Sequence, residues 1–250
     1  MNRLFLLIPL VPFPITYKKG PLMHIRDRIW WLCLKALKRW TRAGLLAEAS
    51  KQINILENPT VLSVGGYGPV DNYLKALLNN SGGRLITFDI NPMHAPQIVG
   101  DVTQISVILE EQRILPDIII ALEVLEHVPH FDRAILSCYQ ALSASGVFLM
   151  STPWITPIHD RPGDYFRFTP ELIKLHLAKF GEFKILARGN YSDSLIALML
   201  RGLFTGGISG KLAMVVGIFL SAVSPLPRVY GDIENVDSCL GYISVAKKLH

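Results

Sequence analysis

Short apolar runs alternate with helix-forming segments between residues 60 and 188, and this alternation limits the fold more than any other feature of the chain. The first run, Val61–Val64, stops at Gly65 and Gly66, which is typical of a buried parallel strand that enters a tight turn. Further strands are expected over residues 84–88, 97–99, 117–121, 147–150, 183–188 and 241–247. Helices are expected over residues 22–52, 71–78, 133–142 and 171–180. The alternation predicts an α/β fold with a doubly wound, mostly parallel seven-stranded sheet.

Three glycines, Gly65, Gly66 and Gly68, follow the first strand. Without side chains they let the backbone approach a ligand, and the next helix adds N–H donors at its N-terminus. Asp89 stands roughly 20 residues further on, at the end of the second strand, where a carboxylate can accept hydrogen bonds from both ribose hydroxyls. Together these residues predict a site for an adenosine-containing ligand. The alternative role for Asp89 is to form the turn ahead of Pro92.

Two more residues are assigned to this site. Asp101 is placed to accept from an adenine amino group, although an aspartate after Gly100 can also serve as an ordinary turn residue. Leu122, next to the fourth strand, completes the predicted cofactor contacts.

Residues 60–188 resemble the class I S-adenosylmethionine-dependent methyltransferases, above all through Asp117–Val128, then Ser151–Pro153 and Asp164–Thr169. Residues 241–247 match the last strand of that fold. The nearest resemblance is to small bacterial members found with surface-polysaccharide or lipid-linked sugar synthesis. It implies S-adenosylmethionine as the cofactor and an oxygen of a small or lipid-linked acceptor, a sugar above all, as the methylated atom.

Two departures from the family pattern concern the cofactor turn. Ser63 stands where the family usually carries an acid, and the turn is one residue shorter than the usual three-glycine form. A relative that keeps the fold as a binding or scaffold protein, without turnover, is therefore the main alternative. A nicotinamide-dependent oxidoreductase is not expected, because the three-glycine fingerprint is absent from the sequence.

Glu123, Glu126 and His127 are spaced to share one helical face. Two carboxylates and an imidazole could hold Mg²⁺ or Mn²⁺, with Asp164 or His159 completing the site. Similar runs bind metal in the small-RNA 2′-O-methyltransferases and occur in quinone-synthesis O-methyltransferases, so metal-dependent methylation of that type is a lesser alternative. The interpretation preferred from the sequence has no metal: the acids favour a helix N-terminus and the imidazole packs under the cofactor pocket.

His159 and His127 are the predicted bases for the acceptor hydroxyl, since each lies just after a strand at the edge where this fold binds acceptors. Arg167, with Tyr165 and Asp164 beside it, is assigned to acceptor binding through a carboxylate or phosphate. The other role for Arg167 is to pair with Asp164 and stiffen the loop, and that role is preferred for the arginine.

The flanking segments divide the chain into a basic, apolar leader and helix at residues 1–57 and a methyltransferase domain at residues 58–250. An apolar helical insertion is expected at about residues 192–238. Its longest uncharged run, Leu212–Pro227, is shorter than the roughly 20 residues that a membrane-spanning helix needs. Insertion residues are therefore expected to cap the site or lie on a membrane.

Much of the positive charge lies in the leader, at Lys18, Lys19, Arg26, Arg28, Lys35, Lys38, Arg39 and Arg42. Interleaved tryptophans and leucines favour a helix on an anionic membrane surface, and a solvated helix packed on the domain fits equally well. Nucleic acid is not an expected partner, because no RNA-binding module accompanies the net charge of +5. Three scattered cysteines without a CxxC pair indicate a reducing compartment, so we expect a cytoplasmic protein. If the leader helix lies on lipid, the protein is peripheral to the inner face of the membrane.

Overall fold

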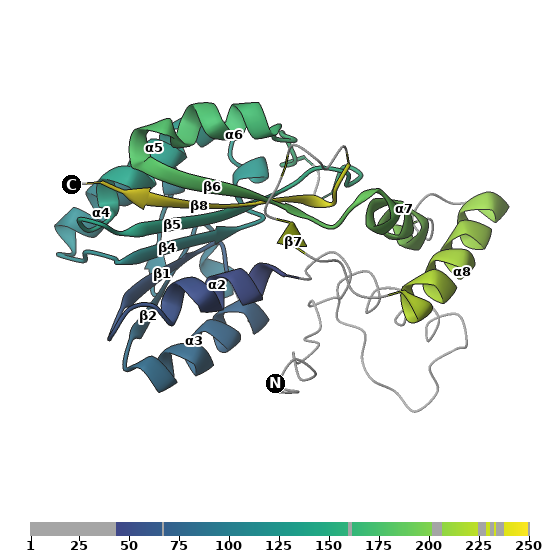
Figure 1. Ribbon diagram of the computed structural model, residues 1–250. Helices are drawn as coiled ribbons and strands as arrows, with labels where there is room; N and C mark the ends of the chain where they lie inside the picture. Colours follow the sequence, from purple (N-terminus) through teal and green to yellow (C-terminus); the bar gives the residue numbers. More distant parts are fainter. Residues whose placement is uncertain are drawn as a thin grey trace.

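The computed structural model describes residues 44–249 apart from residues 67, 160–161, 202–206, 225–228, 231–232 and 234–237. The basic helix predicted over residues 22–52 thus lies outside the described residues except for its end, where α2 (Leu45–Ile53) is found. A single sheet carries helices on both faces, and a pair of helices projects beyond one end of it (Figure 1).

Among the described residues, eight strands form the sheet in the order β3-β2-β1-β4-β5-β8-β6-β7. The strands are β1 (Thr60–Val64), β2 (Arg84–Asp89), β3 (Ile98–Val99), β4 (Ile118–Leu122), β5 (Val147–Pro153), β6 (Gly181–Arg188), β7 (Val229–Tyr230) and β8 (Gly241–Lys248). Strands β1 to β5 pair in parallel, and β8 lies antiparallel between β5 and β6. This confirms the mostly parallel seven-stranded sheet, to which β7 adds a two-residue antiparallel edge on β6.

The helices divide between the two faces of the sheet (Figure 1). They are α3 (Pro69–Ser81), α4 (Ile105–Glu111), α5 (Phe131–Ala141), α6 (Pro170–Leu177), α7 (Tyr191–Leu200) and α8 (Gly207–Val223). Helices α2 and α3 pack on one face, whereas α4, α5 and α6 pack on the other. Val61 and Leu62 show why β1 is mostly apolar: both are fully buried, and successive side chains enter opposite cores.

Helix α6 begins as its sequence predicts. The Thr169 hydroxyl accepts a hydrogen bond from the Leu172 N–H at 3.2 Å, and Pro170 occupies the first turn, where its missing N–H costs nothing. The loop after β5 is therefore anchored at a defined point before it enters the helix.

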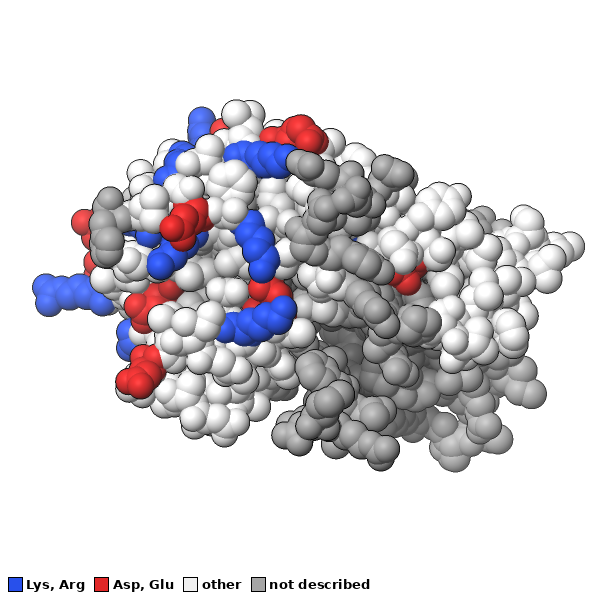
Figure 2. Space-filling view, in the orientation of Figure 1, with Lys and Arg blue, Asp and Glu red and all other residues white. Residues whose placement is uncertain are grey.

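Helices α7 and α8 form the apolar insertion predicted before the last strand. Gly217 lets the two helices approach closely, because a Cβ there would come within 2.9 Å of the Leu200 nitrogen. The opposite face of α8 exposes a row of large apolar side chains, namely Ile208, Leu212, Val215, Val216, Phe219 and Val223. In Figure 2 charged side chains gather over the sheet, while the part that carries α7 and α8 is nearly free of them. None of the described helices combines the length and apolar character needed to cross a membrane.

Candidate active site

The glycine turn after β1 is held close to the ends of β2 and β4. The Gly65 N–H donates to the Phe88 carbonyl at 2.8 Å, and Gly65 has a φ of 63°. A Cβ at this position would lie 2.7 Å from a methyl group of Val124, so only glycine fits both the backbone and the space. Gly68, with a φ of 62°, is the N-cap of α3, and no described side chain caps that helix.

A carboxylate that the sequence analysis did not assign completes this turn. The Ser63 hydroxyl donates to Asp71 Oδ1 at 2.7 Å, and a Cβ at Gly66 would overlap both side chains. Burial raises the pKa of Asp71, the Ser63 hydrogen bond lowers it, and the charge of Asp89 raises it further. Asp71, in the first turn of α3, thus brings to the turn the negative charge that Ser63 does not supply. The sequence feature that could have identified Asp71 is its position, since it is an acid in the first helical turn after the glycines.

Asp89 ends β2 and is 6% exposed. Its Oδ1 accepts from the Asn91 N–H at 2.8 Å, and its Oδ2 lies 2.8 Å from His94 Nδ1. The turn-forming role is therefore present in the structure, and the ribose-binding role stays a prediction.

Asp101 and Leu122 occupy less enclosed positions. Asp101 is exposed and accepts from the Thr103 N–H at 2.9 Å, as the N-cap of a 3₁₀ turn at residues 102–104. Leu122 is partly buried at the end of β4. Their contacts with a cofactor stay predictions.

A groove of about 590 Å³ begins at the glycine turn. It runs between α3 and β2, and its lining includes Gly66, Gly68, Asp71 and Gln97. The connection from β2 to β3 also lines the groove, at residues 94–97, and it contains only the short 3₁₀ turn η2 (Pro92–His94), whereas parallel strands are usually joined through an α-helix. Space is therefore available next to the turn and its carboxylate.

Glu123 does not share a helical face with Glu126 and His127, contrary to the expectation from spacing. It has a φ of 56° and precedes the 3₁₀ turn η4 (Leu125–His127). Its carboxylate accepts from the Ser151 hydroxyl and from Arg188 Nη2, each at 3.0 Å. The side chain of Arg188, the last residue of β6, is only 2% exposed, and it pairs with the Glu123 carboxylate. Sequence reasoning missed Arg188 because it lies 65 residues from its partner.

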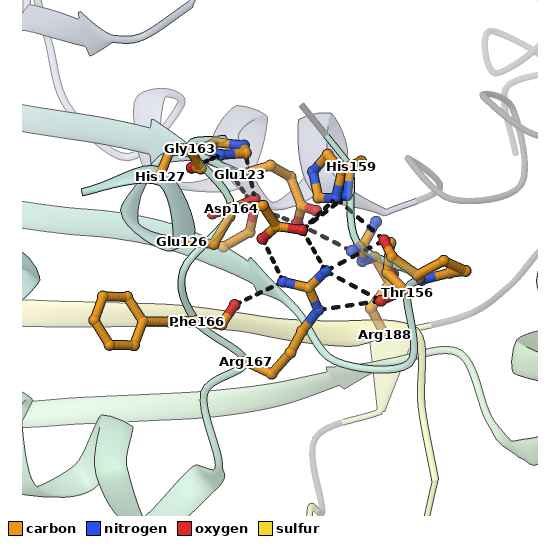
Figure 3. A network of polar contacts seen from close by, with 12 residues as sticks. Glu123, Glu126, His127, Thr156, His159, Gly163, Asp164, Phe166, Arg167 and Arg188 are labelled. Carbon is orange, nitrogen blue, oxygen red and sulfur yellow. Dashed lines mark hydrogen bonds and ion pairs between the residues drawn. The ribbon is translucent and has the colours of Figure 1, made fainter. Parts of the chain in front are cut away.

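Glu126, His127 and His159 lie together at the ends of β4 and β5 (Figure 3). Glu126 is fully buried, and neither carboxylate oxygen has a hydrogen-bond partner among the described residues. Burial raises the pKa of Glu126 well above its ordinary value, and the charge of Glu123 adds to the shift. The His127 and His159 rings meet edge to face with centroids 5.1 Å apart. The two predicted bases, His127 and His159, thus lie in one cluster with Glu126, which like His127 was a candidate metal ligand.

The loop after β5 is held by an ion pair between Asp164 and Arg167 (Figure 3). Arg167 Nη1 and Nη2 donate to the two Asp164 oxygens at 2.6 and 2.8 Å, and this hydrogen bonding holds the pKa of Asp164 well below its usual range. The remaining guanidinium N–H groups donate to the carbonyls of Thr156, Pro157 and Phe166.

All guanidinium donors of Arg167 are therefore used within the loop, and Asp164 is completely enclosed. This geometry matches the loop-stiffening role and leaves no donor for an acceptor. Tyr165 is 52% exposed, and its backbone N–H donates to the Glu126 carbonyl at 2.8 Å. Of the three residues assigned to acceptor binding, Tyr165 is the one that faces solvent.

No family model and no curated protein sequence matches the chain. Several solved structures are similar to the chain. A chain from the complex between the Haloferax volcanii Trm112 methyltransferase activator and the protein assigned as its methyltransferase is 14% identical, with 89% of this chain and 97% of that chain covered and a TM-score of 0.53. A protein assigned as a sarcosine dimethylglycine methyltransferase from Galdieria sulphuraria is 16% identical over 82% of this chain and 84% of its own, with a TM-score of 0.49.

An S-adenosylmethionine-dependent methyltransferase from Archaeoglobus fulgidus is also 16% identical, covering 84% of this chain and 97% of its own, with a TM-score of 0.48. At such identities a likeness shows the fold alone. The fold of this chain is the Rossmann-like fold of the class I methyltransferases.

Proposed function

We propose that this chain transfers a methyl group from S-adenosylmethionine to an oxygen of a small or lipid-linked acceptor, with a sugar as the favoured class. The observation that carries the proposal is the pair of carboxylates, Asp71 and Asp89, that flanks the glycine turn of a methyltransferase fold. When bound, the sulfonium of the cofactor supplies an activated methyl group. The residues of the chain have to bind it, orient the acceptor and take up a proton.

Each polar end of the cofactor has a counterpart at the turn. The first N–H groups of α3 are suited to the cofactor's carboxylate, because a helix N-terminus carries partial positive charge. Asp71 is suited to its ammonium group and Asp89 to its ribose hydroxyls. The loss of an acid at Ser63 is thereby offset by an acid that hydrogen-bonds to Ser63 itself, which favours a working cofactor site over a degenerate one.

The acceptor side is formed by His127 and His159. Methyl transfer to a hydroxyl requires the oxygen to be in line with the transferred carbon and its proton to pass to a base. Both imidazoles lie at the carboxyl ends of parallel strands, the edge at which an open α/β sheet binds its ligands. We expect one of the two imidazoles to accept the proton of the acceptor hydroxyl.

Replacing Asp71 by asparagine is expected to weaken S-adenosylmethionine binding at least about tenfold, because a hydrogen bond to a charged group contributes roughly 1.5–3 kcal/mol. The affinity of the wild type should also fall as the pH decreases through the raised pKa of Asp71, since the protonated carboxyl no longer attracts an ammonium. Isothermal titration calorimetry measures both effects.

Asp132→Asn is the matched control, since Asp132 is also an acid in the first turn of a helix but is exposed on α5. Equal affinities for the two variants would contradict the role of Asp71. Turnover is tested by transfer of labelled methyl from S-adenosylmethionine into membrane and soluble fractions. Binding without transfer to either fraction would identify a scaffold rather than an enzyme.

The exposed row on α8 supports a lipid-linked acceptor and a location at the inner face of the membrane. Apart from the exposed Lys211, helix α8 has no charged residue, and large apolar side chains occupy both its packed and its outward sides, a pattern found in buried or membrane-associated helices. The leader contributes nine Lys and Arg residues against one acid among residues 1–43, which would favour an anionic surface. Cys138 and Cys239 are both free thiols, in keeping with a reducing compartment.

Charge placed on that row is expected to weaken membrane association. With Leu212 and Phe219 both changed to aspartate, the partition coefficient onto anionic vesicles should fall at least about tenfold, because burying either side chain contributes roughly 1.5–3 kcal/mol. Co-sedimentation with vesicles at low and high salt measures this. Val107→Asp, on the exposed side of α4, is the control. Full recovery of the wild type in the supernatant would reject membrane contact.

A further inference from the structure

Glu126, His127 and His159 have the spacing of ligands to one metal ion. Each offers one ligand atom, and these atoms all lie within 4.8 Å of one another. Bonds from first-row metals to imidazole nitrogen and carboxylate oxygen are about 2.0–2.2 Å long, so shifts of under about 1 Å would let a single ion reach all three. Glu126 and His127 lie in the turn η4 after β4, and His159 lies in the loop after the neighbouring strand β5 (Figure 3). The pairing of β4 with β5 therefore sets the distance between the turn and the loop.

The imidazole of His127 is already in the tautomer that a metal requires. Its Nδ1 lies 2.7 Å from the Gly163 carbonyl, which can only accept, so Nδ1 carries the hydrogen. Nε2 then presents its lone pair, and it lies 3.8 Å from Glu126 Oε1. That distance is too long for a hydrogen bond but suits two atoms that share an ion. Metal-binding histidines usually donate their second N–H to a carbonyl or a carboxylate in this manner.

His159 is oriented by a carboxylate. Its Nδ1 lies 3.2 Å from Asp164 Oδ2, and the same carboxylate accepts from its backbone N–H at 2.9 Å. Asp164 is itself fixed by Arg167. A ring held by a carboxylate that is in turn held by an arginine has the support found around catalytic metal ligands.

Glu126 provides an independent indication. A fully buried carboxylate without a hydrogen-bond partner among the described residues is costly, because burial removes its hydration without replacement. Either a proton or a cation has to neutralise it. Two imidazole rings beside it favour the cation, since they supply further ligands that a protonated carboxyl does not need.

We propose that Glu126, His127 and His159 bind one divalent first-row transition-metal cation, such as Zn²⁺, Mn²⁺ or Fe²⁺. Two imidazoles with one carboxylate favour these ions over Mg²⁺ and Ca²⁺, which prefer oxygen ligands. Glu123 is not a ligand, because Arg188 and Ser151 engage its carboxylate. Three protein ligands leave coordination positions open for an acceptor.

The catalytic role of the ion rests on the proposed methyl transfer, whereas the binding of the ion to the three ligands does not. A hydroxyl bound to the ion has a lowered pKa and loses its proton more readily. His127 and His159 would then act as ligands, and the proton would pass to solvent or to a base outside the cluster. The acceptor would be a hydroxyl compound able to reach an ion beside the end of β4.

The test uses the full chain, stripped of metal with a chelator and titrated with Co²⁺, whose visible absorption reports coordination by nitrogen and oxygen. We expect one saturable site in the wild type. Glu126→Gln and His159→Gln should each weaken it by at least tenfold, as even supporting residues around metal ligands change affinity by about 10–100-fold. His130→Gln, an exposed histidine close by in sequence, should bind like the wild type.

His159 is only partly buried, so its variant keeps the proposal testable if Glu126→Gln fails to fold. Absence of saturable Co²⁺ and Zn²⁺ binding to the wild type would overturn the proposal, as would unchanged affinity in folded His159→Gln. Calorimetry with S-adenosylmethionine on the metal-free protein tests the proposed function separately. A failure to bind metal would not imply a failure to bind S-adenosylmethionine, and the reverse also holds.

Discussion

Replacing Asp89 by asparagine is expected to weaken S-adenosylmethionine binding about 100-fold. Both contacts that Asp89 makes, with the Asn91 N–H and with His94, are ones that an asparagine side chain can keep. The variant loses only the negative charge that would accept hydrogen bonds from two ribose hydroxyls. Such bonds contribute roughly 1.5–3 kcal/mol each, and about 2.7 kcal/mol corresponds to 100-fold in affinity. Isothermal titration calorimetry with the purified chain measures the change.

His94→Gln separates ligand binding from turn formation, because it removes the ring that faces Asp89 while keeping the carboxylate. Its affinity for the cofactor should stay within about threefold of the wild type. If His94→Gln reproduced the loss, Asp89 would act through the turn. If Asp89→Asn bound the cofactor normally, Asp89 would have no part in the site.

The strands of the fold were predictable because their signals are local. Val61, Leu62 and Val64 are apolar because both faces of β1 are covered, and Gly65 marks the end of the strand in the sequence as in the structure. Thr169 and Pro170 predict the start of α6 through a cap that involves only neighbouring residues. The short helix α4 was not predicted, since a short apolar run is compatible with either a helix or a strand.

The side-chain contacts of the site were less predictable, because their partners lie far apart in sequence. Ser63 and Asp71 face each other across a glycine turn whose course the sequence does not define. Glu123 was expected on a helical face, but its positive φ and its pairing with Arg188 depend on the position of β6. The spacing of residues in the sequence predicts which of them reach the same edge of the sheet. The direction in which each side chain points depends on the three-dimensional structure.

His159 illustrates the same limit. The sequence places it after β5 and places Glu126 after β4, and neighbouring parallel strands bring both to one edge. Nothing local indicates that Asp164 contacts the His159 ring, or that Glu126 lacks a hydrogen-bond partner among the described residues. A metal site was therefore a weaker interpretation of the sequence than it is of the structure.

Replacing Arg167 by methionine is expected to lower the free energy of unfolding by about 3 kcal/mol, since removing one partner of a buried ion pair leaves the other charge uncompensated. Asp164 is fully enclosed, and it would lose both hydrogen bonds from the guanidinium. The melting temperature should fall by roughly 10 °C for a domain of this size. Urea denaturation followed by circular dichroism measures the free energy.

Lys174→Met is the matched control, because Lys174 and Glu171 form an ion pair with the same i,i+3 spacing but at the surface. An exposed pair of this kind contributes at most about 1 kcal/mol, so the control variant should unfold nearly like the wild type. The difference between the two variants then measures what enclosure adds to the Asp164–Arg167 pair. Should both variants lose the same small amount, the loop after β5 would be held by its packing, and Arg167 would be available to bind an acceptor after all.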